Sequence, residues 1–159
     1  DFSISLVSTF TDTFYQTPTG EFSALAEAVA SGELPSYASP IGFGDINGTD
    51  VGAVEQKDRL QVSYKKGEYR ASLSVLRIGE LADSGETSAG FMYLIPSMTT
   101  ADLSISKNVE LGGNKGRVKF VVKNIADERA PLADGYNGYF SDVHSDMGRN
   151  YYLDLRVDF

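Results

Sequence analysis

The sequence predicts an all-β protein whose strands and loops have the layout of an antiparallel transmembrane β-barrel. Six segments alternate apolar and polar residues with the two-residue period of a β-strand. Their connections follow the order long, short, long, short, long, which places short turns at one end of an antiparallel meander and long loops at the other. This segregation is typical of outer-membrane barrels, whose strands cross the bilayer with about 9 to 11 residues.

The composition fits one domain and excludes several classes of protein. The chain has 159 residues, 42% of them hydrophobic, and a formal net charge of −8, which disfavours nucleic-acid binding. It has no cysteine, so it can form neither a thiolate zinc site nor a cysteine nucleophile. No stretch approaches the roughly 18 apolar residues that a transmembrane helix needs.

The first predicted strand covers residues 2–10 (FSISLVSTF), in which every second residue from Phe2 is mostly apolar. Residues 11–53 carry three prolines and six glycines without sustained alternation, and we expect a long loop there. Within this loop, EFSALAEAVAS at 21–31 has one apolar helical stripe. It predicts a short helix that ends at Gly32.

The rest of the chain predicts two hairpins, two further long loops and a last strand. The expected strands cover residues 54–64, 69–78, 98–106, 118–123 and 150–159. The short turns are expected at 65–68 and at 107–116, which contains Gly112-Gly113-Asn114, and the long loops at 79–97 and 127–148.

The apolar faces of these strands carry aromatic residues at both ends. Those near the short turns are Phe2, Tyr64, Tyr69 and Phe159, and those near the long loops are Phe10, Phe14, Tyr15, Tyr93 and Tyr151. Two aromatic girdles around an apolar band suit a bilayer with two interfaces, although ordinary β-propensity also enriches aromatic residues in strands. Asp58 falls on this face, and we expect a bulge between Asp58 and Leu60 to turn it to the other side.

Two sequence motifs mark the C-terminal third. A predicted strand ends in NIAD at 124–127, and after a loop the last strand opens with GRNYY at 148–152 and closes on Phe159. With these motifs, residues 118–159 resemble the last two strands of TonB-dependent outer-membrane receptors, whose tetrapeptide carries Phe where this chain has Ala126. Residues 58–76 also resemble an earlier barrel hairpin of that family.

The resemblance implies a barrel of about 22 strands, of which this chain supplies the last six. Residues 1–159 would then be the C-terminal segment of the barrel domain, without the plug domain, the TonB-binding segment and the earlier strands. The implied location is the Gram-negative outer membrane. The implied partners are the remainder of the receptor, the TonB complex through the plug, lipopolysaccharide and membrane lipid, and the outer-membrane assembly machinery, whose signal includes Phe159.

The expected function is active uptake of a scarce nutrient, such as a metal chelate (siderophore), a vitamin or a glycan. A soluble secreted β-sandwich binding module and a small intact outer-membrane barrel are the alternatives, although six strands are fewer than the eight usually needed to close a barrel. No nucleophile elbow, nucleotide-binding glycine motif or paired carboxylates stand out, so we expect no enzyme, cofactor or metal site.

The expected long loops are acidic. Residues 13–53 and 79–97 hold eight acidic residues and no Lys or Arg, and residues 127–148 hold five acidic residues against Arg129. At the loop end of a barrel, such acidic loops attract cations or bridging divalent ions and disfavour anionic ligands. In the third loop, Tyr136, Tyr139 and Phe140 are candidates for stacking on a sugar or an aromatic ligand, or for packing the loop against its neighbours.

Two further groups in the loops are expected to be structural or solvated. Residues 45–50 (DINGTD) space their oxygens like part of a calcium loop, but Gln56 stands where a bidentate Glu is needed, which favours a turn. His144 is the single histidine and lacks partners for a zinc site or a catalytic triad. We therefore expect His144 to be exposed to solvent.

Overall fold

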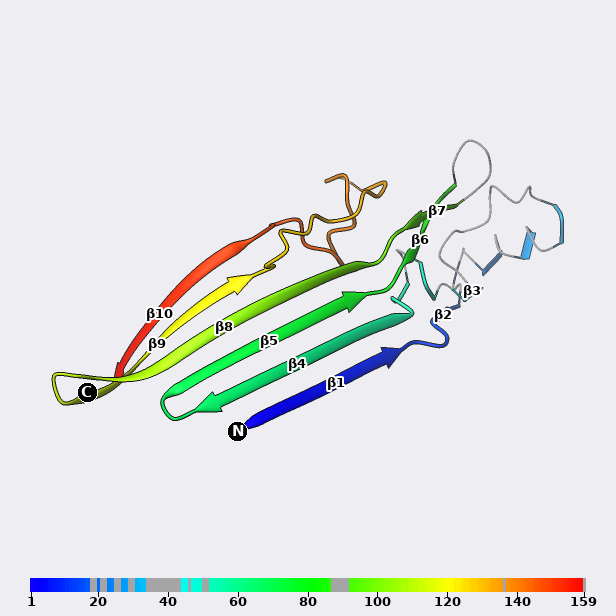
Figure 1. Ribbon diagram of the computed structural model, residues 1–159. Helices are drawn as coiled ribbons and strands as arrows, with labels where there is room; N and C mark the ends of the chain where they lie inside the picture. The colour runs from blue at the N-terminus through cyan, green and yellow to red at the C-terminus, as the bar shows by residue number, and fades with distance from the viewer. Residues whose placement is uncertain are drawn as a thin grey trace.

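Six antiparallel strands form one sheet in the computed structural model (Figure 1). The structure describes residues 1–17, 20, 23–24, 27–28, 31–33, 44–45, 47–49, 52–86, 92–135 and 137–158. The strands of the sheet are β1 (Phe2–Phe10), β4 (Gln56–Lys66), β5 (Tyr69–Ile78), β8 (Met98–Leu111), β9 (Asn114–Lys123) and β10 (Asn150–Asp158). They pair in chain order, β1-β4-β5-β8-β9-β10, so the sheet is a meander as the alternation predicts.

The short turns and the long loops lie at opposite ends of the sheet, which confirms the predicted arrangement. Figure 1 shows both chain termini at the end of the short turns, and the connections that leave β1, β5 and β9 at the other end. The turn between β4 and β5 contains Gly67 at φ 57°, and the turn between β8 and β9 is formed by Gly112 and Gly113 at φ 59° and 84°. Positive φ at these positions gives hairpin turns whose twist matches that of the flanking strands.

The second hairpin is longer than predicted. The sequence predicts a turn over 107–116, whereas β8 continues to Leu111 and β9 begins at Asn114. Only Gly112 and Gly113 separate the strands. Because two consecutive glycines can both adopt positive φ, a two-residue turn is enough, and the residues on either side remain in the ladder.

The predicted loops contain short strands of their own. β2 (Tyr15–Gln16) pairs with β3 (Gly44–Asp45), and β6 (Leu81–Glu86) pairs with β7 (Met92–Ile95), with a register shift between Ala82 and Glu86. These segments are too short or too irregular for alternation to predict them. The described parts of loops 11–53 and 79–97 therefore contain β-structure.

The expected helix at 21–31 lies in part outside the described residues. Within it, Ser23, Ala24, Glu27 and Ala28 have helical backbone. The N–H of Glu33 donates to the carbonyl of Ala28 (2.9 Å), and Gly32 has φ 79°. This is the hydrogen bond of a Schellman C-cap, which agrees with Gly32 as the predicted stop.

The two faces of the sheet differ in polarity. Residues directly opposite in an antiparallel ladder project to the same side, so the register assigns every strand residue to a face. One side, here called the apolar face, carries on its six strands Phe2, Ile4, Leu6, Phe10, Leu60, Val62, Tyr64, Tyr69, Ala71, Leu73, Val75, Ala101, Leu103, Ile105, Val109, Val118, Phe120, Val122, Tyr151, Leu153, Leu155 and Val157. The other side, the polar face, carries mainly serine, threonine and charged residues.

Asp58 stays on the apolar face, and the expected bulge is wrong. The register runs without a shift through Asp58, which stands opposite Ser8 on β1 and Arg77 on β5. Its carboxylate accepts hydrogen bonds from Arg77 Nη1 (3.3 Å) and Gln56 Nε2 (3.0 Å). These partners satisfy the charge without any change in backbone register, so no bulge is needed.

Among the described residues, no helix is long and apolar enough to span a bilayer.

Candidate functional site

A small apolar core lies between the loops and the loop end of the sheet. Val54, Ile78, Leu81 and Ile95 are buried together, with Leu81 1% and Ile95 0% exposed. The partly buried side chains packed against them are Leu76, Ala133, Phe140 and Val143. This loop cluster brings together the residues that flank β4, the β6–β7 hairpin and the third long loop. Burial of these side chains is what fixes the loops to one another.

Hydrogen bonds connect the three loops in sequence. The N–H of Ala82 in β6 donates to the carbonyl of Gly48 in the first loop (2.7 Å). The N–H of Asp134 in the third loop donates to the Asp83 carboxylate (3.0 Å), which is 4% exposed. The described parts of the loops therefore form a connected structure, although each looked like a separate connection in the sequence.

The two motifs that carry the family resemblance meet at the base of the third loop. Asn124, at φ 49°, uses its side-chain amide both to donate to the Glu128 carbonyl (2.8 Å) and to accept from the Glu128 N–H (3.0 Å). Asp127 accepts the N–H of Arg149 with its carboxylate (2.7 Å). A Cβ at Gly148 would lie 2.8 Å from the same carboxylate oxygen, so this approach requires glycine.

An ion pair closes the third loop. Arg129 binds the Asp146 carboxylate through Nε and Nη2, and the N–H of Ala130 donates to the same carboxylate (2.9 Å). The Arg129 guanidinium and the Ala130 N–H lower the pKa of Asp146 below its usual value. The ion pair between Arg129 and Asp146 therefore persists well into the acidic pH range.

His144 is buried, contrary to the expectation that it is exposed to solvent. The residue is 3% exposed, and neither ring nitrogen has a hydrogen-bond partner among the described residues. The N–H of His144 donates to the Phe140 carbonyl (2.9 Å) and closes a turn. In this turn, Phe140 and Val143 pack against the loop cluster. Burial lowers the pKa of the imidazole below 6.5, because the charged form would lose its hydration.

We expect the third loop to loosen as the pH falls below about 6.5, the pKa of an exposed histidine. The opened loop binds a proton more readily than the closed loop, so the closed state is fully stable above that pH and loses stability below it. Hydrogen exchange of residues 140–146 in the complete protein, compared at pH 7.5 and pH 5.5, measures this effect. A His144→Leu variant should lose the pH dependence, and an unchanged dependence in that variant would rule out His144 as the cause.

The loop residues proposed from the sequence fall in different places. Phe140 packs against the loop cluster, and Tyr139 is half-buried, while Tyr136 and Phe159 are outside the described residues. Of residues 45–50, Asn47 and Gly48 form a turn, as predicted, but Ile46 and Asp50 are not described. In the described part of the chain, no group of three or more His, Asp or Glu residues is placed to hold a metal ion. Ligand binding by Tyr139 and Phe140 stays a prediction.

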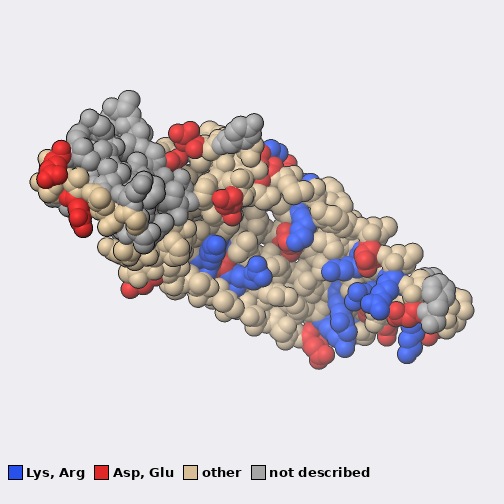
Figure 2. All heavy atoms as spheres, turned by 180° about the vertical axis from the view of Figure 1, so that it is seen from behind, with Lys and Arg blue, Asp and Glu red and all other residues tan. Residues whose placement is uncertain are grey.

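The polar face is basic, a feature that reasoning from the loops alone missed. Nine of the fourteen Lys and Arg residues occupy it: Lys57, Arg59, Lys65, Arg70, Lys115, Arg117, Lys119, Lys123 and Arg156. Figure 2 shows Lys and Arg side chains spread along this side of the molecule, from its middle to the right-hand end of the view. The periodic placement of these residues within the predicted strands could have revealed the face.

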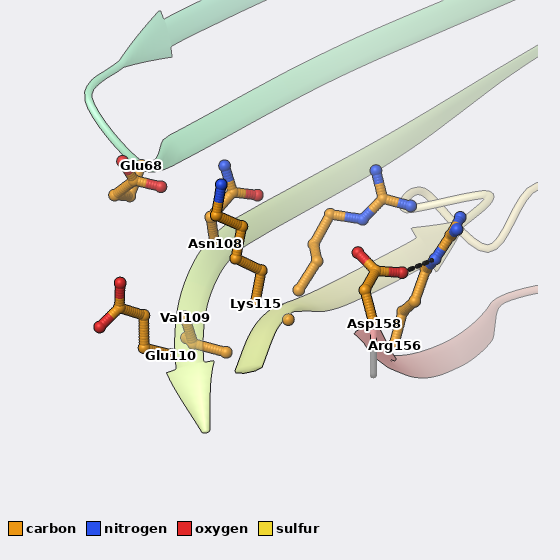
Figure 3. Close-up of a pocket in the computed structure, with 9 residues that line it drawn as sticks. Glu68, Asn108, Val109, Glu110, Lys115, Arg156 and Asp158 are labelled. Carbon is orange, nitrogen blue, oxygen red and sulfur yellow. Dashed lines mark hydrogen bonds and ion pairs between the residues drawn. The ribbon is translucent and has the colours of Figure 1, made fainter. Parts of the chain in front are cut away.

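Two hollows lie on the polar face near the short turns. One of them lies at the ends of β8, β9 and β10 and mixes charges of both signs (Figure 3). There Arg156 Nε donates to the Asp158 carboxylate (3.0 Å), with Lys115 and Glu110 on the neighbouring strands. The second hollow crosses β1, β4, β5, β8 and β9 and has a volume of about 480 Å³.

No family model, curated protein or solved structure matches this chain in the three comparisons made.

Proposed function

We propose that this chain is part of the barrel wall of a TonB-dependent transporter, which takes up a scarce nutrient across a Gram-negative outer membrane. Its apolar face contacts lipid and its polar face lines the lumen. Its long loops lie outside the cell, and its short turns lie in the periplasm. The observation that carries this proposal is the exposed apolar face, which continues across all six strands of a meander with segregated turns.

The apolar face is too exposed for a water-soluble surface. Leu6 is 67%, Leu153 74% and Leu155 62% exposed, and neither a second sheet nor a helix covers this face within the described residues. Soluble proteins rarely expose a contiguous apolar patch of more than a few hundred Å². A β-sandwich would use such a face as its core, so the soluble binding module is less well supported.

The apolar band runs obliquely across the strands, as expected for strands that are tilted in a bilayer. Towards the loops, it ends on β4 and β5 at the charged pair Asp58 and Arg77. In the register, Tyr64 on β4 lies level with Leu153 on β10. The apolar run of β4 ends at Tyr64 on the side of the short turns, whereas that of β10 continues for two further residues of this face, to Val157. Barrel strands tilt by about 35–45°, so a band parallel to the membrane crosses them at an angle.

The edges of the sheet agree with a wall that continues into further strands. Within the described residues, β1 pairs only with β4 and β10 pairs only with β9. An open strand edge leaves unpaired N–H and C=O groups, which lipid does not tolerate. In the complete transporter these edges pair with the remaining barrel strands, which also separates this proposal from a small six-stranded barrel.

Cysteine labelling on intact cells tests the topology. The chain has no cysteine, and Ser141 in the third loop and Glu68 in a short turn are both exposed. In the complete protein, Ser141→Cys should react with a membrane-impermeant maleimide, whereas Glu68→Cys should react only after the outer membrane is permeabilised. Equal labelling of both sites on intact cells would contradict the orientation.

Extraction with alkaline carbonate is the control for membrane insertion. The inserted protein should stay in the membrane pellet, because its apolar face is in contact with lipid. Release into the supernatant together with soluble periplasmic proteins would favour the secreted binding module instead.

A further inference from the structure

We propose that the second hollow on the polar face binds a small solute that carries phosphate or carboxylate oxyanions. This basic hollow is defined by Lys65, Arg70, Arg117 and Lys119, together with Ser3, Ser63, Ser72, Ser104 and Ser106. The inference rests on the proposed function in one respect, the exposure of the polar face to a water-filled lumen.

The strand register places cations and hydroxyls in two adjacent rows. In one row, Lys65 on β4, Arg70 on β5 and Lys119 on β9 follow one another across the sheet, with Ser106 on β8 between the last two. The next row towards the loops is made of Ser3, Ser63, Ser72 and Ser104 on four consecutive strands. Neighbouring strands are about 4.8 Å apart, so the backbones of Lys65 and Lys119 lie about 14 Å apart, and the long side chains of the row flank a solute bound between them.

Like charges stand directly opposite one another in this hollow. Within the hollow, Lys65 pairs with Arg70. Arg117 lines both hollows and pairs with Arg156 of the first one, which has Asp158 beside it. Opposed like charges destabilise a sheet. A bound anion between the opposed cations reduces this repulsion, so an anionic ligand stabilises the pairing of these strands.

The cationic side chains of the hollow have hydrogen-bond donors that no other described side chain uses fully. Within the described residues, Lys65, Arg70, Arg117 and Lys119 form no ion pair, although Asp154 stands opposite Lys119 and Asp1 lies at the rim. The Nε of Arg117 is buried without a hydrogen-bond partner. Arginine forks, ammonium groups and serine hydroxyls are the donors that bind phosphate and carboxylate oxygens.

The acidic loops and the basic hollow lie at opposite ends of the sheet. An anion therefore finds its favourable potential near the short turns and not at the mouth, where acidic residues gather. The size of the hollow, about 480 Å³, suits a molecule such as a phosphate ester or a tricarboxylate. The expectation from the sequence, that the acidic loops disfavour anionic ligands, concerns the other end of the sheet and does not conflict with this hollow.

Binding is tested on the complete protein in detergent, with inorganic phosphate and citrate as separate probes at constant ionic strength. Equilibrium dialysis should detect saturable binding of one or both probes, and the stronger one identifies the preferred oxyanion. Arg70→Gln and Lys119→Gln should each weaken binding about tenfold or more, the usual cost of a lost charged hydrogen bond. The matched controls are Lys66→Gln and Lys107→Gln on the apolar face, which should leave binding unchanged.

A measurement on the unaltered protein tests the same site if the variants fail to fold. Acetylation of Lys65 and Lys119, followed by mass spectrometry, should slow at least fivefold when the bound probe is present, while Lys66 and Lys107 should react at the same rate as before. If neither probe binds or protects, the hollow is not an oxyanion site, and an acidic protein segment becomes its better occupant. Equal protection of all four lysines would likewise overturn the proposal.

Carbonate extraction of the membranes from which the protein is purified keeps this inference separate from the proposed function. Protection of Lys65 and Lys119 in a protein that carbonate releases from the membrane would refute the transporter and retain the anion site. Retention in the membrane without any protection would refute the anion site and retain the transporter.

Discussion

Replacement of Leu155 with arginine is expected to lower the stability of the inserted protein by about 2–4 kcal/mol. Leu155 lies near the middle of the apolar run on β10, is 62% exposed, and pairs with Val118 on β9. In a bilayer this position faces hydrocarbon, where a guanidinium loses its hydration. Urea unfolding of the complete protein in lipid vesicles measures the difference in the free energy of unfolding.

The neighbouring position supplies the control for this substitution. Asp154 projects to the polar face, so Asp154→Asn should change the stability by no more than about 0.5 kcal/mol, as substitutions on a solvated surface do. If water covered both faces, Leu155→Arg would also fall within that range. Equal, small effects of the two substitutions would therefore contradict contact of the apolar face with lipid.

The six strands of the sheet could be predicted from sequence because each has a long alternating segment. Burial or lipid exposure of one face forces that alternation, and the ladder then follows from chain order in a meander. Strand ends were predicted less well. The pair Gly112 and Gly113 could have limited the turn to two residues, since both can adopt positive φ.

The loop structure could not be predicted, because it depends on single contacts between residues far apart in the sequence. The hydrogen bond from Asp134 to Asp83 joins residues 51 positions apart, and the bond from Ala82 to Gly48 joins two different loops. No periodic pattern records such contacts. Asp58 illustrates the same limit, since its partner Arg77 lies on the neighbouring strand and makes a bulge unnecessary.

The candidate sites show which signals were present in the sequence. The motif at 124–127 identified the base of the third loop, and the structure adds the reason for its residues: the Asn124 amide caps Glu128, and Asp127 receives the N–H of Arg149. His144 gave no such signal, because a lone histidine between two aspartates in a polar loop looks solvated. Only the fold of the loop onto the apolar cluster buries it.

The loop cluster gives the second large expected effect. Leu81 is 1% exposed among Val54, Ile95 and Phe140, so Leu81→Ala should cost about 2–5 kcal/mol of loop stability through lost burial and the cavity left behind. Because only Leu76 and Ile78 of the cluster belong to the six-stranded ladder, at the loop end of β5, the loops should open to protease while the sheet persists. Limited proteolysis of the complete protein, with heat-dependent gel migration as a measure of the folded sheet, detects the two separately. Leu132→Ala, in the same third loop but 75% exposed, is the matched control and should leave cleavage unchanged. Cleavage that increases equally in both variants, or a sheet that unfolds together with the loops, would show that the cluster is not an independent stabilising unit.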